Sequence, residues 1–165
     1  MDDLKRHELW RSARLALISI SAVAAASIIG QIATYPNLAP WYASLAKPSF
    51  NPPNWVFGPV WTTLYLLMAF SVWRILRLPD GSMRRTALTL FFIQLALNTA
   101  WSWMFFAANS PLLGLVNIVP QIALIVATVV VFYRLDRLAG YCLLPLSAWV
   151  AFATVLNFSI WLLNR

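Results

Sequence analysis

The segment Lys47–Trp61 reads KPSFNPPNWVFGPVW and carries four prolines, four large aromatic residues and one charged residue. A water-exposed loop is normally polar, and the interior of a helix disfavours proline. Tryptophan and tyrosine are enriched where a bilayer meets water. The segment therefore indicates a rigid connection at the surface of a membrane.

The whole chain has the composition of a membrane protein. Its 165 residues are 61% hydrophobic and 10% charged, whereas soluble domains are about half apolar and about a quarter charged. A net charge of +7 would favour nucleic acid as a partner of a soluble protein. Here the basic residues lie in short segments between apolar runs, so they indicate membrane topology, and no nucleic acid is expected. The single cysteine, Cys142, and the single histidine, His7, offer almost no material for a disulfide framework, a metal site or acid–base catalysis.

Uncharged stretches long enough to cross a bilayer occur five times. About 20 helical residues span the hydrocarbon layer, and backbone groups in lipid must bond within their own helix. We therefore predict an all-α, polytopic membrane protein, a single domain over residues 1–165. Its five-helix transmembrane bundle has helices at about 15–34, 55–76, 86–108, 111–133 and 139–163. The first stretch also has the basic flank of a signal peptide, but its apolar run is too long and no polar region precedes a cleavage site.

The basic residues predict the orientation of the bundle. If all five helices cross, every lysine and arginine except Lys47 and Arg165 falls on one side. Because basic residues concentrate on the cytoplasmic side, we expect a cytoplasmic N-terminus and an outside C-terminus. Helical spans with this charge bias favour the inner membrane of a bacterium.

The connection 35–54 is the only long one, and it lies outside the membrane in this topology. Its prolines restrict their own backbone and that of the residue before each of them, so the loop is stiff. One interpretation is an aromatic anchor belt at the interface. The other is a lid over a cavity between the helices, in which Trp41, Phe50, Pro53 and Trp55 contact a ligand.

Polar residues on the predicted helices recur on single faces. In the third helix Gln94, Asn98, Trp101 and Phe105 share a face at 100° per residue. Polar groups in membrane helices usually turn inward, and small residues allow close helix contact. The opposite face of the third helix carries three alanines and predicts the interface of a homodimer: Ala96, Ala100 and Ala107.

Amides and indoles from four helices fall into one layer of the outer half. A rise of 1.5 Å per residue places Trp61, Trp101, Asn117 and Asn157 roughly 9–11 Å from the outer helix ends. Asn98, Gln121 and Ala153 follow at roughly 15 Å, and Trp149 lies deeper. This layer is either a hydrogen-bond network that only specifies packing or the wall of a pocket that opens outward. The spans carry no acidic or basic side chain apart from their ends, which argues against a proton-coupled transporter or ion pump. A pocket of this kind suits a flat apolar ligand with a few polar edges.

Three segments resemble the TspO/MBR family of tryptophan-rich sensory and translocator proteins, in order and with few gaps. They are WYASLAKPSFNPPNWVFGPVWTTLY (41–65), QLALNTAWSWMFF (94–106) and LPLSAWVAFATVLN (144–157). The resemblance implies a five-helix bundle that forms dimers and binds porphyrins such as protoporphyrin and haem. It also implies affinity for sterols and for benzodiazepine-type drugs.

The resemblance also implies roles for single residues. Trp61 and Trp149 match tryptophans implicated in the light-dependent breakdown of protoporphyrin, and Tyr65, Asn98, Trp101 and Ala153 match pocket positions. Two departures stand out. Phe50 replaces the usual tryptophan before Pro52-Pro53, and Phe158 replaces the tyrosine of the sterol-recognition pattern in the fifth helix.

We therefore expect a membrane receptor or carrier for porphyrins (protoporphyrin IX or haem) and related flat ligands, with a sensory or transport role in tetrapyrrole metabolism and stress. Porphyrin is a ligand in this hypothesis; no cofactor is required and no metal is expected. The alternatives are a light-dependent porphyrin-degrading enzyme that uses Trp61 and Trp149, a sterol- or lipid-binding protein, and a structural protein whose amides only fix packing. The candidate ligand-binding residues are Trp41, Phe50, Pro53, Trp55, Trp61, Tyr65, Asn98, Trp101, Phe105, Asn117, Gln121, Trp149, Ala153 and Asn157.

Overall fold

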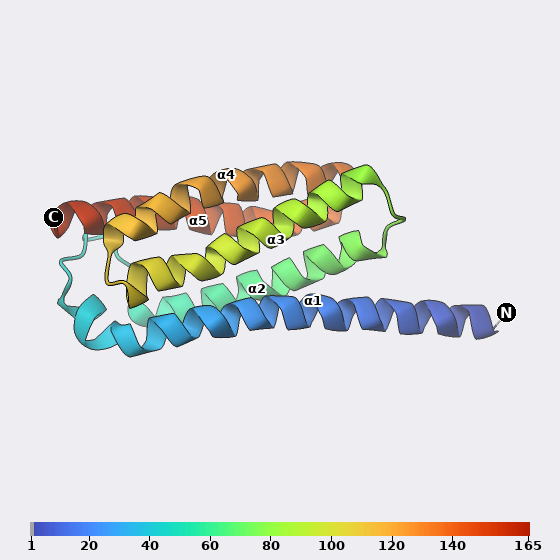
Figure 1. Ribbon diagram of the computed structural model, residues 1–165, viewed down its shortest axis with the longest axis horizontal. Coiled ribbons are helices and arrows are strands. Elements are labelled where there is room, and N and C mark those ends of the chain that lie inside the picture. Colours follow the sequence, from blue (N-terminus) through green and yellow to red (C-terminus); the bar gives the residue numbers. More distant parts are fainter. Residues whose placement is uncertain (1) are drawn as a thin grey trace.

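Five long helices form the protein, as shown by a computed structural model that describes residues 2–165 (Figure 1). Two of them end in a short π-helical turn. The elements in chain order are α1 (Asp2–Asn37), η1 (Leu38–Tyr42), α2 (Asn54–Arg77), α3 (Ser82–Ser102), η2 (Trp103–Ala107), α4 (Pro111–Leu135) and α5 (Arg137–Leu163). All five helical segments are long and apolar enough to cross a membrane. The predicted all-α five-helix bundle is confirmed.

The helices pack around a ring in the order α1, α2, α5, α4, α3, with α3 returning to α1. Neighbouring helices run in opposite directions, except α1 and α3, which run in the same direction. The N-terminus and the turns α2–α3 and α4–α5 lie at one end of the bundle, which we call the basic end (Figure 1). The C-terminus and the segment 43–53 lie at the other, which we call the loop end.

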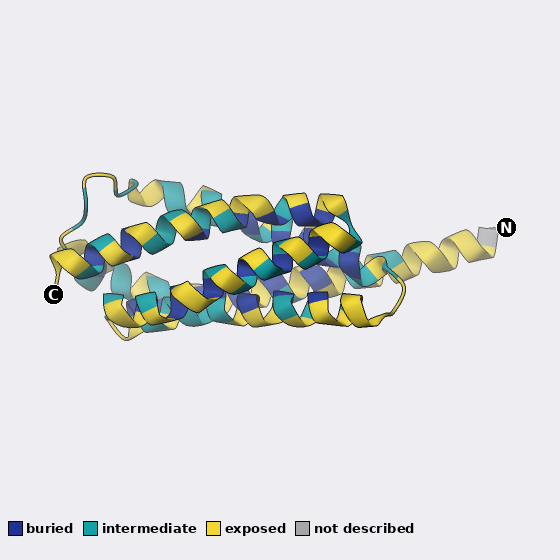
Figure 2. Ribbon diagram, turned by 90° about the horizontal axis from the view of Figure 1, so that it is seen from above, coloured by how far each residue is buried: buried dark blue, intermediate teal, exposed yellow. Residues whose placement is uncertain are grey.

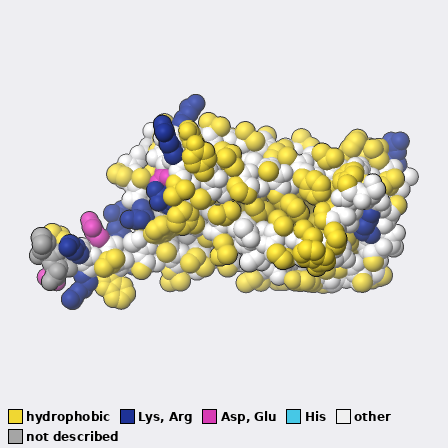
Figure 3. Space-filling model, turned by 180° about the vertical axis from the view of Figure 1, so that it is seen from behind, with side chains coloured by type: hydrophobic (Ala, Val, Ile, Leu, Met, Phe, Trp, Pro, Cys, Tyr) yellow, Lys and Arg dark blue, Asp and Glu magenta, His cyan; other side chains and the backbone are white. Residues whose placement is uncertain are grey.

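Apolar side chains cover the outside of the bundle, as expected for a protein whose solvent is lipid. Figure 2 shows exposed residues along the outer face of every helix, and Figure 3 shows hydrophobic side chains across the middle of one face with Lys and Arg toward its ends. The tightest packing lies in the half toward the basic end, where Met68, Val72, Phe91, Phe132 and Leu143 are at most 1% exposed. The half toward the loop end is less densely filled and holds a cavity.

The helices are longer than the apolar runs from which they were predicted. Helix α1 was expected at 15–34 but begins by Asp2 and continues to Asn37, because charged residues extend a membrane helix into water without interrupting it. Other ends lie up to four residues beyond the predicted bounds, most at α3, which begins at Ser82 instead of 86. The start of α4 at Pro111 and the end of α5 at Leu163 are as predicted, and α3 with η2 ends at Ala107 instead of 108.

The expected loop 35–54 is therefore wrong in its first half. Residues 35–37 complete α1, and η1 and its following turn carry the helical chain to residue 44, which leaves only 45–53 outside helices. The break falls at Ala39, whose extended backbone (φ −132°, ψ 128°) precedes Pro40. A proline disfavours the helical conformation in the residue before it. Pro40 therefore introduces a kink at Ala39, and the helical chain continues after it.

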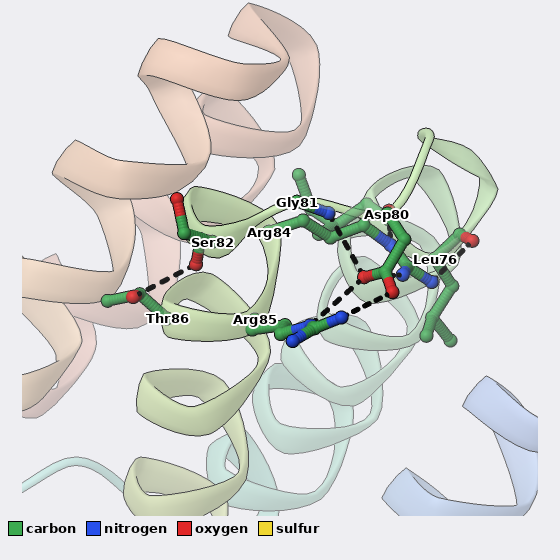
Figure 4. Close-up of polar contacts among 8 residues, drawn as sticks. Leu76, Asp80, Gly81, Ser82, Arg84, Arg85 and Thr86 are labelled. Carbon is green, nitrogen blue, oxygen red and sulfur yellow. Dashed lines mark hydrogen bonds and ion pairs between the residues drawn. The ribbon is translucent and has the colours of Figure 1, made fainter.

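Carboxylates organise the two turns at the basic end. In the α2–α3 turn, Asp80 accepts hydrogen bonds from the side chains of Arg84 and Arg85 and from the Gly81 N–H (Figure 4). The hydrogen bond from Arg85 is the main reason that the pKa of Asp80 is lowered to about 2. In the α4–α5 turn, Asp136 accepts from the Arg74 side chain at 2.8 Å and from the Ala139 N–H at 3.0 Å. Asp136 thus caps α5 and ties the turn to α2.

The dual role of Asp136 makes it a stability determinant. Asp136→Ala removes a helix cap, which is typically worth about 1 kcal/mol, and leaves Arg74 without its partner, so we expect the free energy of unfolding in detergent to fall by about 1–2 kcal/mol. The Arg74 hydrogen bond lowers the pKa of Asp136. The charge-dependent part of the stabilisation is therefore present at neutral pH and is lost as the pH falls through the folded-state pKa.

Asp136→Asn separates the two contributions, because asparagine keeps the cap and removes the charge. It should lose less stability than the alanine variant at pH 7. The difference between Asp136→Asn and the unmodified protein should shrink in acid, as measured by thermal unfolding followed by circular dichroism. If the stability difference between Asp136→Asn and the unmodified protein stays constant from pH 7 into acid, the role of the ion pair is contradicted.

Candidate functional site

A cavity of about 600 Å³ lies between the helices in the half toward the loop end. Its volume is in the range of sites that enclose a drug-sized ligand, about 300–1,000 Å³. All five helices contribute to the wall, α4 only through Ile118 and Gln121. Most of the predicted ligand-binding residues line it: Trp55, Trp61, Tyr65, Asn98, Trp101, Phe105, Gln121, Trp149, Ala153 and Asn157.

Side-chain hydrogen bonds between helices shape this wall. The Tyr65 hydroxyl on α2 donates to Asn98 Oδ1 on α3 at 2.9 Å. The Trp101 indole N–H on α3 donates to Asn157 Oδ1 on α5 at 3.1 Å, and Asn157 Nδ2 donates to the Pro111 carbonyl of α4 at 2.8 Å. Asn157 is thus engaged on both atoms of its amide, and its main contribution is to hold α3, α4 and α5 together.

Other polar groups of the wall have no protein partner. Among residues 2–165 no hydrogen bond engages the amide of Gln121, which is 2% exposed, or the indole N–H groups of Trp61 and Trp149. The Nδ2 atom of Asn98 is equally unengaged. These groups offer mostly hydrogen-bond donors and no charge, so the cavity can orient a neutral or delocalised acceptor on an otherwise apolar molecule.

Aromatic rings supply most of the remaining surface. Trp61 and Tyr65 lie with ring centroids 5.5 Å apart on successive turns of α2. On the facing helix, Trp149 contacts Phe57 of α2 at 5.8 Å and Phe152 at 5.5 Å. Trp101 stacks on Phe105 at 4.8 Å. A flat ligand between α2 and α5 would meet two indoles, and indoles suit stacking.

Four predicted residues lie away from the cavity wall. Trp41 packs edge-on against Phe105 at 5.4 Å, and Phe50 packs against Phe152 at 6.3 Å. Pro53 precedes α2, and Asn117 is buried in α4 with its Oδ1 unpaired. None of them lines the cavity.

Only part of the expected lid 35–54 lines the cavity. No residue of 43–53 lines the cavity, whereas Leu38 and Tyr42 of η1 do. The cover is therefore the turn at the end of α1. The proline-rich segment packs outside this turn, where the Tyr42 hydroxyl donates to Asn51 Oδ1 at 3.2 Å.

Sequence reasoning missed the contribution of α1 to the wall. One face of this helix packs tightly, since Gly30 lies so close to α3 that an added Cβ would stand 3.3 Å from Ser102 Oγ. The adjacent face lines the cavity with Ile20, Ala24, Ser27, Gln31 and Thr34, among others. The signal was the pair Ser27 and Gln31, polar residues one turn apart that hydrogen-bond at 2.8 Å.

The predicted dimer face is open in the single chain. Ala96 and Ala107 are exposed and Ala100 is half-buried. Gln94, on the inward face, is 1% exposed with neither amide atom paired. The orientation of both faces agrees with the 100° periodicity, and the homodimer itself stays a prediction.

Comparison with known proteins gives consistent matches. The sequence profile of the TspO/MBR family matches residues 18–162. The chain is 41% identical over 149 residues to "Tryptophan-rich protein TspO" of Archaeoglobus fulgidus, which covers 88% of this chain and 94% of that protein. It is 41% identical over 123 residues to the human "Translocator protein", 73% of each chain. It is 39% identical over 124 residues to "Tryptophan-rich sensory protein" of Cereibacter sphaeroides, 75% of this chain and 77% of the relative.

Proposed function

The chain belongs to the TspO/MBR family, and from this premise we propose that its cavity binds porphyrins, with protoporphyrin IX and haem as the reference ligands. Membership and the five apolar helices make it an integral, multi-pass membrane protein. The relatives' names, translocator protein and tryptophan-rich sensory protein, support a receptor or sensory role in the membrane. The ligand and the direction of any transport belong to our proposal.

One observation carries the proposal: two indoles on facing helices, Trp61 and Trp149, line one uncharged cavity with no hydrogen-bond partner for their N–H groups in residues 2–165. A porphyrin is a flat aromatic ring with polar groups at its edge. Stacking on indoles supplies affinity for the ring, and the donors of Asn98 and Gln121 supply orientation at the edge. The cavity therefore has the complementary chemistry.

The same proposal includes the surroundings of the protein. The basic end carries the arginines of both turns, so by the bias of basic residues toward the cytoplasm we place that end and the N-terminus inside and the loop end outside. A bacterial inner membrane fits helical spans of this kind. A homodimer through Ala96, Ala100 and Ala107 fits the open face of α3.

Titration with protoporphyrin IX tests the proposal on the full chain in lipid nanodiscs. Tryptophan fluorescence should be quenched to saturation. Ala153→Phe should weaken binding by about tenfold or more, equal to about 1.4 kcal/mol, because Ala153 lines the cavity and a phenyl ring there occupies the ligand's volume.

Ala151→Phe is the matched control, because Ala151 lies two residues away on α5, is exposed and does not line the cavity. It should bind protoporphyrin like the unmodified protein. Absence of saturable quenching in the unmodified protein, or an equal loss of affinity in both variants, would contradict the proposal.

A further inference from the structure

The cavity is open on one side of the bundle. Its exposed wall residues all belong to α1 and α2, and they include Ile20, Tyr35, Trp55 and Leu66, which are 56%, 65%, 75% and 66% exposed. The wall residues contributed by α3, α4 and α5 are buried or half-buried. The opening therefore lies between α1 and α2; we call it the α1–α2 slit.

The slit extends deep into the membrane-spanning part of the bundle. Leu66 lies roughly 18 Å along α2 from Asn54, and Ile20 lies roughly 25 Å along α1 from Asn37, at 1.5 Å per residue. The hydrocarbon core is only about 30 Å thick. Most of the slit thus faces acyl chains, and water reaches at most its upper rim.

Side chains along the slit change polarity with depth. Toward the loop end its edges carry Tyr35, Asn54 and Trp55, and deeper edges carry Ala24 and Leu66. Tyr and Trp prefer the interface between headgroups and hydrocarbon. The edge thus follows the polarity profile of one bilayer leaflet, which suits an amphiphilic molecule dissolved in that leaflet.

The end of the bundle above the cavity is closed by contacts between distant segments. Asn164 clamps Ala46 from both sides: its Oδ1 accepts from the Ala46 N–H at 3.0 Å, and its Nδ2 donates to the Ala46 carbonyl at 2.9 Å. The Lys47 ammonium lies 4.6 Å from the centroid of the Tyr42 ring. Together these contacts hold segment 45–53 against the end of α5 and against η1, which covers the cavity.

We propose that ligands enter and leave the cavity sideways, through the α1–α2 slit, from the leaflet at the loop end. This inference rests on the proposed function and narrows its ligand to the class of flat amphiphiles that partition into lipid. A pocket that opens to the side replaces the expected pocket that opens outward. The loop end, which faces water, is closed by the contacts of Asn164 with Ala46, whereas the α1–α2 slit, which faces lipid, is open.

A substitution at Gly58 can obstruct the slit. Gly58 lies on its α2 edge, is exposed, and has no atom within 4 Å of an added Cβ. Gly58→Phe should therefore fold and place a ring in the opening. We expect both the association and the dissociation rate of protoporphyrin IX in phosphatidylcholine nanodiscs to fall by about tenfold or more. Stopped-flow tryptophan quenching gives association, and mixing with excess empty nanodiscs gives dissociation.

Ala24→Phe provides a second obstruction from the α1 edge. It should slow exchange in the same way. If the added ring of Gly58→Phe fills the cavity and weakens binding, the exchange rates of Ala24→Phe decide whether the slit is the route. Asn164→Ala is the control for entry through the loop end, because it releases the clamp on Ala46 and leaves the slit intact; its rates should match those of the unmodified protein.

The outcomes separate the inference from the proposed function. Failure of the unmodified protein to bind protoporphyrin would contradict the function itself. Normal binding with unchanged exchange rates in Ala24→Phe, or faster exchange in Asn164→Ala, would overturn entry through the slit.

Discussion

Replacing Gly140 with alanine adds only one methyl group, yet it is expected to lower the stability of the bundle strongly. A Cβ at this position would lie 2.6 Å from Cα and Cβ of Tyr133 and 2.8 Å from its backbone nitrogen. Real Cβ atoms do not approach backbone this closely, and the backbone of α4 cannot move as a side chain can. Helices α4 and α5 would have to separate next to the Asp136 turn.

The expected size follows from overpacking in a filled interior. Such substitutions typically cost about 1–3 kcal/mol and occasionally more, and we place Gly140→Ala at the upper end because the obstacle is backbone. The free energy of unfolding in detergent, from thermal or denaturant melts followed by circular dichroism, measures the loss.

Gly81→Ala is the matched control. Gly81 also lies at the basic end, in the α2–α3 turn, but an added Cβ meets nothing within 4 Å, and its extended backbone (φ −176°) suits any residue. Its stability should stay within about 0.5 kcal/mol of the unmodified protein. An equally small effect for Gly140→Ala would show that α4 and α5 are not in the close contact described.

Trp149→Ala and Trp61→Ala are expected to have the largest effects on ligand binding. Each removes one of the two indoles that line the cavity from α5 and α2. Truncation of a central aromatic contact commonly costs about 2–3 kcal/mol or more, which corresponds to protoporphyrin binding weaker by about 30- to 150-fold. Titrations followed by porphyrin absorbance avoid the changed tryptophan signal of the variants.

Trp103→Ala controls for the loss of an indole as such. Trp103 directly follows α3 as the first residue of η2, is 45% exposed and does not line the cavity. Its replacement should leave binding unchanged. If Trp61→Ala and Trp149→Ala bind like Trp103→Ala, the ligand does not lie between α2 and α5.

Phenylalanine at the same positions separates stacking from hydrogen bonding. Trp149→Phe keeps a flat ring and loses the N–H donor, so an intermediate affinity would show that both contribute. Illumination of each complex also tests the enzymatic alternative. Loss of the porphyrin spectrum in the unmodified protein but not in Trp61→Phe or Trp149→Phe would favour light-dependent breakdown, whereas stable spectra throughout favour a binding protein.

The sequence predicted the bundle well because apolar run length is a strong signal in a membrane protein. Helical periodicity also placed residues correctly: Asn98, Trp101 and Phe105 share an inward face, and Ala96 and Ala107 point outward. Both predictions depend only on distance along one helix. Such distances are known before any tertiary structure is formed.

Properties that depend on contacts between helices were harder to predict. Asn98 and Asn157 are both inward amides at similar depth, yet Asn157 is engaged at both atoms in packing, whereas Asn98 keeps Nδ2 unengaged. The amide layer therefore contains a hydrogen-bond network for packing, at Asn157, and an unengaged polar group on the cavity wall, at Asn98. On α1 the periodic signal was weak because lipid and cavity walls are both apolar, so Ala24 could not be assigned to either side.

The clamp between Asn164 and Ala46 has a consequence for biogenesis. The two residues are separated by 118 positions, and α5 leaves the ribosome after the other four helices. Until α5 has been inserted, nothing at its far end can hold segment 45–53 in place. During synthesis the bundle therefore exists for a time without the contacts that close its loop end. Closure of that end is a late event in its maturation.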